Sequence, residues 1–200
     1  MKIFNMKDLV PEDNKILLSI AEEVQLPLSE EDLEILKGMS AFVLESQIKE
    51  LDDNGEPYRQ AVAIAAPQLG ISKRMFVIST VDDAGTLFTM TVVNPKIQNH
   101  SKSLIVLPDG EGCMSVIGRR GLVPRYQNIR WSGTLVDLET GETEYKYMSK
   151  IDGYLGIIFQ HEYDHLDGIL FTSKMTEEFP DVPVVEESAL PEKEIIKEDE

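Results

Sequence analysis

The chain has 200 residues, of which 36 are acidic and 19 basic, so its formal net charge is −17. The length suits one domain, 42% hydrophobic residues allow a buried core, and the negative charge argues against nucleic acid or an anionic membrane as a partner. No stretch is long and apolar enough to span a bilayer, and the first residues lack the apolar segment of a signal peptide, so we expect a cytoplasmic protein.

Helical patterns dominate the start of the chain. Apolar residues at helical spacing predict a short amphipathic helix over 12–24. Ser29 followed by three acidic residues signals the start of a long helix over about 30–51. Residues 61–68 are small and apolar, which is typical of a buried strand or turn. They could also form a segment that approaches a ligand closely, with Gln68 directed at it.

Five segments rich in β-branched and aromatic residues predict two antiparallel hairpins and a connecting strand. These segments are 73–81, 87–93, 96–106, 128–138 and 143–148, with a turn at 82–85 between the first two. Residues 107–115 form a glycine-rich loop that carries Cys113, the only cysteine. A lone cysteine is either a buried inert thiol or a functional group, and its place in a loop favours function.

An apolar helix is predicted over about 152–168, and a last strand over 169–171. The helix carries two of the three histidines, His161 and His165. Residues four apart share one face of a helix, so both imidazoles can reach a single metal ion. Glu162 lies beside them in the position of a general base that acts on a water without ligating the metal.

A catalytic metal site needs a third protein ligand. Phe171 stands where the long form of this histidine motif has a third histidine, which excludes that peptidase pattern. Glu177 and Glu178 lie in an acidic stretch without a helical pattern. Cys113 is therefore the best third ligand, and a Cys-His-His set suits Fe²⁺, Zn²⁺, Ni²⁺ or Co²⁺.

Three separated motifs resemble those of peptide deformylases in order and spacing, and the resemblance covers roughly residues 5–175. They are Ala61–Gln68 (AVAIAAPQ), Glu111–Ser115 (EGCMS) and Gln160–His165 (QHEYDH). The long segment before the first motif is similar to that of the Gram-positive-like class. The resemblance implies removal of the formyl group from N-formylmethionyl peptides on nascent chains, with release of formate and usually with Fe²⁺ as the native metal.

The resemblance also implies roles for single residues. Glu162 matches the general base and acid, and Gln68 and the backbone N–H of Met114 match the donors that hold the formyl oxygen. Arg125 matches an arginine that pairs with Glu111 and steadies the cysteine loop. The matched metal ligands are Cys113, His161 and His165.

The substrate pocket and the first motif are less settled by the sequence. Ile64, Ile157 and Ile158 are candidates for the apolar pocket of the methionine side chain, although core packing explains them equally well. Ala61 and Ala63 stand where the family has glycines, the second of which approaches the substrate backbone. If φ is negative at this position and the methyl group points away from the substrate, substrate binding is little affected.

Two hypotheses from different classes remain, namely an active deformylase and a degraded paralogue that keeps metal and fold but only binds peptides. A zinc peptidase is a third.

The elements predict an α+β fold in which antiparallel sheets pack around a central metal-binding helix, with helices at the N-terminus. We assign residues 1–175 to this catalytic domain and residues 176–200, with a net charge of −8, to an acidic, flexible tail. Its deletion should leave activity intact. Any ribosome contact should be transient, without direct binding of RNA.

Overall fold

The computed structural model describes residues 2–81 and 87–185. The helical elements are η1 (Met6–Asp8), α1 (Glu30–Ile48), η2 (Ala66–Leu69), α2 (Gly153–Leu166) and η3 (Phe171–Ser173). The strands are β1 (Ala63–Ala65), β2 (Met75–Val81), β3 (Leu87–His100), β4 (Leu104–Ile105), β5 (Glu111–Cys113), β6 (Val116–Gly121), β7 (Arg125–Tyr126), β8 (Asn128–Val136) and β9 (Thr143–Asp152). Among these residues, no helix is both long enough and apolar enough to cross a membrane.

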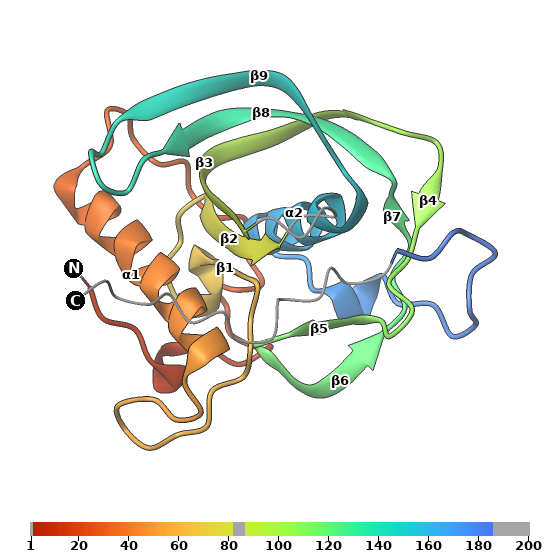
Figure 1. Ribbon diagram of the computed structural model, residues 1–200, viewed down its shortest axis with the longest axis horizontal. Helices are drawn as coiled ribbons and strands as arrows, with labels where there is room; N and C mark the ends of the chain where they lie inside the picture. Colours follow the sequence, from red (N-terminus) through yellow and green to blue (C-terminus); the bar gives the residue numbers. More distant parts are fainter. Residues whose placement is uncertain (1, 82–86, 186–200) are drawn as a thin grey trace.

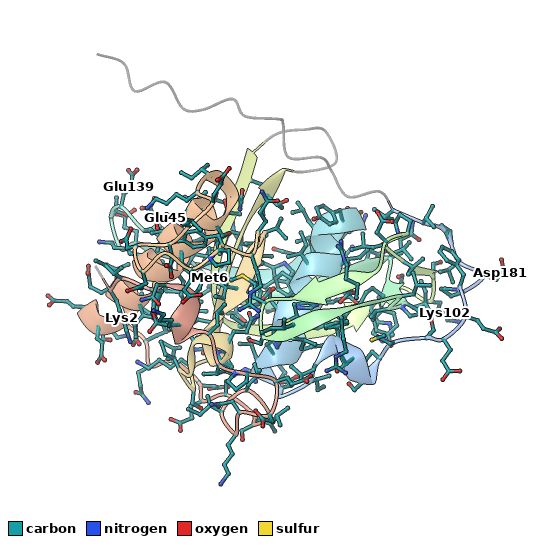
Figure 2. The ribbon with its side chains drawn as sticks, turned by 90° about the horizontal axis from the view of Figure 1, so that it is seen from below. Lys2, Met6, Glu45, Lys102, Glu139 and Asp181 are labelled. Atoms are coloured by element: carbon teal, nitrogen blue, oxygen red, sulfur yellow. The ribbon has the colours of Figure 1, made fainter. Side chains whose placement is uncertain are left out.

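Helix α2 lies at the centre of the molecule, enclosed by three antiparallel sheets (Figure 1). The largest sheet has the order β1-β2-β3-β8-β9, and the other two pair β4 with β7 and β5 with β6. Helix α1 packs on the other side of β1 and β2. The predicted α+β fold with antiparallel sheets around a central helix is therefore confirmed. Figure 2 shows Lys2, Glu45 and Glu139 at the α1 end and Lys102 and Asp181 at the opposite end.

Strands β1 and β2 separate two hydrophobic cores, because successive side chains of a strand point to opposite faces. Ile64 and Val77 pack in the core that contains α1. Ala63 and Phe76 face the core that contains α2. Burial on both faces explains why these strands read as nearly continuous apolar runs in the sequence.

The predicted helix over 12–24 is wrong, because its backbone groups bond to distant segments. The N–H of Ala21 donates to the carbonyl of Leu166 at 2.8 Å, and the N–H of Arg74 donates to the carbonyl of Glu22 at 2.7 Å. The apolar spacing still marks burial, since Leu17, Ala21 and Val24 are buried. Tertiary pairing therefore replaces the helix at these positions.

Helix α1 is confirmed, with the Ser29 hydroxyl accepting from the N–H of Asp32 at 3.1 Å, but it ends three residues early. Strand β3 runs through Asn94-Pro95, where a shift of register forms a bulge. Both hairpins are confirmed, and the turn at 82–85 lies outside the described residues. The predicted strand over 169–171 is wrong, since Phe171 begins η3.

Candidate active site

A cavity of about 730 Å³ opens between β1, the β5–β6 hairpin and α2. It brings together most of the residues that the sequence indicated. These are Ala61, Ala63, Gln68, Glu111, Cys113, Met114, Ile157, Ile158, His161 and Glu162. Ile64 is not among them, because β1 directs its side chain into the α1 core, where it is fully buried. The structure therefore does not support Ile64 as a pocket residue.

Cys113, His161 and His165 form the one group in the described chain that could hold a metal ion through three or more Cys, His or acidic ligands. Their ligand atoms all lie within 4.8 Å of one another. The two histidines are one turn apart on α2, and Cys113 ends β5 with its Sγ 3.4 Å from Nε2 of His165. One thiolate and two imidazoles suit a tetrahedral ion with a fourth position open.

Glu111 fixes the orientation of His161. Its Oε2 lies 2.8 Å from Nδ1 of His161. A carboxylate at this distance holds the proton on Nδ1 and leaves Nε2 free to ligate a metal. The residues therefore fit a metal centre in which a carboxylate supports one histidine ligand.

The electrostatics of the two histidines suit a cation. Burial disfavours a charge on His161, yet hydrogen bonds to Cys113 and Glu111 hold its pKa well above the usual value. Burial, with His161 and Arg125 nearby, holds the pKa of His165 well below the usual value, so its ring is neutral. A site whose anions favour a proton on one ring also favours a metal cation.

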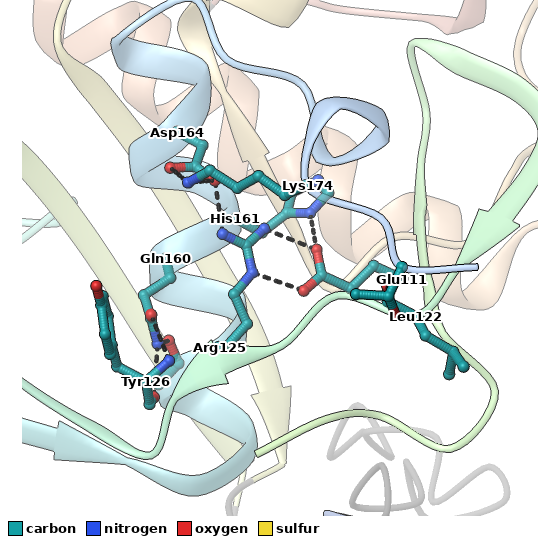
Figure 3. Close-up of polar contacts among 10 residues, drawn as sticks. Glu111, Leu122, Arg125, Tyr126, Gln160, His161, Asp164 and Lys174 are labelled. Atoms are coloured by element: carbon teal, nitrogen blue, oxygen red, sulfur yellow. Dashed lines mark hydrogen bonds and ion pairs between the residues drawn. The ribbon is translucent and has the colours of Figure 1, made fainter. Parts of the chain in front are cut away.

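Arg125 occupies the centre of an ionic network beside His161 (Figure 3). Its Nε and Nη2 donate to Glu111 at 2.7 and 2.8 Å, and its Nη1 donates to Asp164 at 2.6 Å. Lys174 also reaches Asp164, at 2.7 Å. The guanidinium holds the pKa of Glu111 down at about 2 although burial opposes this. The sequence suggested the pairing of Arg125 with Glu111 but not Asp164 or Lys174.

Gln160 attaches α2 to β7 next to this network (Figure 3). Its Oε1 accepts from the N–H of Tyr126 at 3.0 Å, and its Nε2 donates to the carbonyl of Tyr126 at 2.9 Å. Tyr126 directly follows Arg125, so these two hydrogen bonds hold the arginine at a fixed place along the helix. The position of Asp164 three residues after His161, on nearly the same helix face, was the signal that could have revealed it.

Glu162 and Gln68 are the polar groups suited to act on a substrate in the cavity. Glu162 is 4% exposed, its Oε2 has no hydrogen-bond partner in the structure as described, and burial raises its pKa to about 7. The Oε1 of Gln68 accepts from the N–H of Ala65 at 2.8 Å. This bond turns the amide nitrogen toward Cys113 Sγ, 3.4 Å away. Gln68 can therefore donate a hydrogen bond into the site.

The alanines of the first motif that replace the expected glycines, Ala61 and Ala63, have unstrained backbones. Among the described non-glycine residues, only Asn94 and Met148 have positive φ, so φ is negative at Ala61 and Ala63. Ala63 packs with the α2 core and is 7% exposed. An alanine at either position therefore needs no strained backbone.

Comparisons with known proteins agree with this geometry. The sequence model of the polypeptide deformylase family matches residues 6–180. The peptide deformylase of Shouchella clausii is 43% identical over 176 residues, which is 86% of this chain and 91% of the relative. Peptide deformylase 2 of Bacillus cereus is 41% identical over 89% of this chain and 94% of its own length.

Solved structures of peptide deformylases are also similar to this chain. The actinonin-bound class I type b peptide deformylase of Acinetobacter baumannii superposes with a TM-score of 0.65 at 29% identity, covering 88% of this chain and 100% of that one. The same enzyme bound to Met-Ala-Ser gives a TM-score of 0.65 at 29% identity, with 84% and 96% covered. These relatives support neither the non-catalytic paralogue nor the zinc peptidase. The chain therefore belongs to the peptide deformylase family and is a deformylating hydrolase.

Proposed function

We propose that this hydrolase removes the formyl group from N-formylmethionyl peptides of nascent chains and releases formate, using one divalent metal per chain. The observation that carries the proposal is the convergence of a three-donor metal set, the buried Glu162 carboxylate and the Gln68 amide in one cavity. The Met-Ala-Ser peptide bound to a similar enzyme has the sequence of a deformylated product.

Cys113, His161 and His165 would hold the metal, with Fe²⁺ proposed as the native ion; the same donors also accept Zn²⁺, Ni²⁺ or Co²⁺. When bound, the metal supplies Lewis-acid polarisation of the formyl group and lowers the pKa of the attacking water. Glu111 keeps His161 in the tautomer that can ligate. Arg125 in turn fixes the Glu111 carboxylate through two hydrogen bonds.

Glu162 would move the protons of the reaction. Its carboxylate takes a proton from the attacking water and then gives that proton to the departing amine nitrogen. A pKa of about 7 suits both steps at neutral pH. The positive charge of Arg125 favours the ionised form, so the carboxylate can begin the cycle as a base.

Two neutral donors would stabilise the negative charge that develops on the formyl oxygen. They are the Nε2 group of Gln68 and the backbone N–H of Met114, both at the wall of the cavity. One such donor is typically worth about 3–4 kcal/mol in the transition state. Ala63, Ile157 and Ile158 line the same cavity and would contact the methionine side chain.

The proposal is tested by formate release from formyl-Met-Ala peptides, using protein prepared without oxygen and analysed for bound metal. We expect turnover with one equivalent of divalent metal, and a loss of about 10²–10⁴-fold in Glu162→Gln with the metal retained. Glu142→Gln, on an exposed turn, is the matched control and should behave like the unaltered chain. Cleavage of unformylated internal peptides, or no formate above the Glu162→Gln background, would refute the proposal.

We also propose that the enzyme works in the cytoplasm and meets ribosomes only transiently. Nascent chains appear there, and the net charge of −17 opposes direct contact with ribosomal RNA. Sedimentation of the protein with ribosomes at low and physiological salt tests this proposal. Stable co-sedimentation that persists at physiological salt would contradict it.

A further inference from the structure

The active-site cavity has a basic rim in a strongly acidic chain. Its exposed or half-buried charged lining residues are Arg59, Arg119 and Arg120. The acidic lining residues, Glu111 and Glu162, are 5% and 4% exposed. Negative charge therefore lies inside the cavity, whereas positive charge surrounds its mouth.

Arg59 differs from Arg119 in its interactions. Arg119 forms an ion pair with Glu12. The half-buried guanidinium of Arg59 makes no ion pair or hydrogen bond within residues 2–81 and 87–185. Burial lowers its pKa, although the electrostatic attraction of Cys113 in the candidate metal site opposes this. A partly desolvated arginine without a partner gains free energy when an anion binds to it.

Arg59 also lies where the active-site cavity meets a second hollow. That hollow has a volume of about 350 Å³ and is lined by Met6, Lys7, Glu56, Pro57 and Arg59. Lys7 and Glu56 face each other across 3.8 Å and neutralise each other. Arg59 therefore lines both spaces and, among the described residues, has no ion pair of its own.

The direction of the substrate places its second and third residues near this rim. In the proposed function, on which this inference rests, the formyl end lies against Cys113 and His161, so the rest of the peptide must leave through the mouth. An extended peptide advances about 3.3 Å per residue. Side chains just after the methionine therefore pass the arginines.

We propose that Arg59 is a specificity-determining residue that favours formyl peptides with an acidic side chain at the second or third position. The planar guanidinium binds a carboxylate through two parallel hydrogen bonds, a geometry that an amide or a cationic side chain cannot match. The positive potential of Arg59 also attracts such peptides and disfavours basic ones.

The test compares kcat/KM for C-terminally amidated formyl-Met-Glu-Ala and formyl-Met-Ala-Glu with their glutamine and lysine counterparts, using metal-loaded enzyme. At low ionic strength, we expect the better glutamate peptide to exceed its glutamine counterpart by about 3–10-fold. The ratio should fall as salt rises. Amidation removes the terminal carboxylate, so only the chosen side chain differs.

Variants assign the preference to one residue. Arg59→Gln should bring the glutamate-to-glutamine ratio close to one, and Arg59→Lys should keep part of it. Arg130→Gln is the matched control, because Arg130 is an exposed arginine on β8 that does not line the cavity. It should retain the full ratio.

Three outcomes would overturn the inference. The first is a ratio of one at both positions in the unaltered enzyme, which needs no variant to fold. The second is a preference that survives unchanged in Arg59→Gln. The third is an equal loss of preference in Arg130→Gln. Turnover of the glutamine peptides separates the two proposals, because its absence would instead refute the deformylase reaction itself.

Discussion

Ala63 places a methyl group on the active-site strand without requiring a strained backbone. Its φ is negative, and its side chain packs with the α2 core. We predict that Ala63→Gly changes kcat/KM by less than about threefold and lowers the free energy of unfolding by about 1 kcal/mol, because glycine is more flexible in the unfolded chain. Formate-release kinetics and urea unfolding measure both quantities. A rise in kcat/KM of tenfold or more would show that the methyl group obstructs the peptide.

Glu111 contacts both His161, a candidate metal ligand, and Arg125 at the centre of the ionic network. We predict that Glu111→Gln weakens metal affinity by about 10–100-fold, because the amide no longer fixes the His161 tautomer by charge. It should also destabilise the fold by about 3–5 kcal/mol, since Arg125 stays buried with one partner fewer. Chelator competition and urea unfolding check the two effects. Asp109→Asn, an exposed change in the same loop, should alter neither, and equal metal affinity in both variants would contradict the prediction.

At the scale of elements, the bulge in β3 ties the N-terminal segment to the sheet. Asn94 has a φ of 48°, and its side chain exchanges two hydrogen bonds of 2.8 Å with the backbone of Val24. We predict that Asn94→Gly costs about 1–3 kcal/mol, for the two lost bonds. Asn94→Ala should cost about 1 kcal/mol more, because alanine resists positive φ. Thermal unfolding of both variants tests the order, and a more stable alanine variant would refute it.

Whether an element could be predicted from the sequence depended on whether its hydrogen-bond partners are local or distant. Helices α1 and α2 have long apolar periodicity and clear ends, so local signals sufficed for them. The segment 12–24 carries the same periodicity. Its backbone, however, forms hydrogen bonds with Leu166, Arg74 and Asn94, which are far from it in the sequence. Local pattern cannot reveal such partners.

The site shows the same division between local and distant information. The three candidate metal ligands could be proposed from the sequence because His161 and His165 share a helix face and the chain offers one cysteine. The roles of Asp164 and Lys174 depend on the side chain of Arg125, which arrives from a different strand. That Arg59 makes no hydrogen bond or ion pair with the described residues is likewise a property of the folded chain that no motif encodes.

At the scale of the whole molecule, residues 176–185 form backbone hydrogen bonds with the preceding part of the chain. The N–H of Thr176 donates to the carbonyl of Leu122 at 2.9 Å. Val106 exchanges hydrogen bonds with the backbone of Pro183 and Val185, at 3.1 and 2.9 Å. Residues 186–200, which hold the rest of the predicted acidic tail, lie outside the described residues. The segment 176–185 therefore supports the chain that leads into the cysteine loop.

Two truncations separate stability from activity. Ending the chain after Val185 should leave both kcat/KM and the free energy of unfolding unchanged. Ending it after Met175 should lower the free energy of unfolding by about 2–4 kcal/mol, because three backbone hydrogen bonds are lost. The turnover of the folded fraction should stay intact, since no residue from 176 to 185 lines the active-site cavity. Urea unfolding and formate release on both proteins test these expectations. A fall in kcat/KM of the folded variant that ends after Val185 would place residues 186–200 in catalysis.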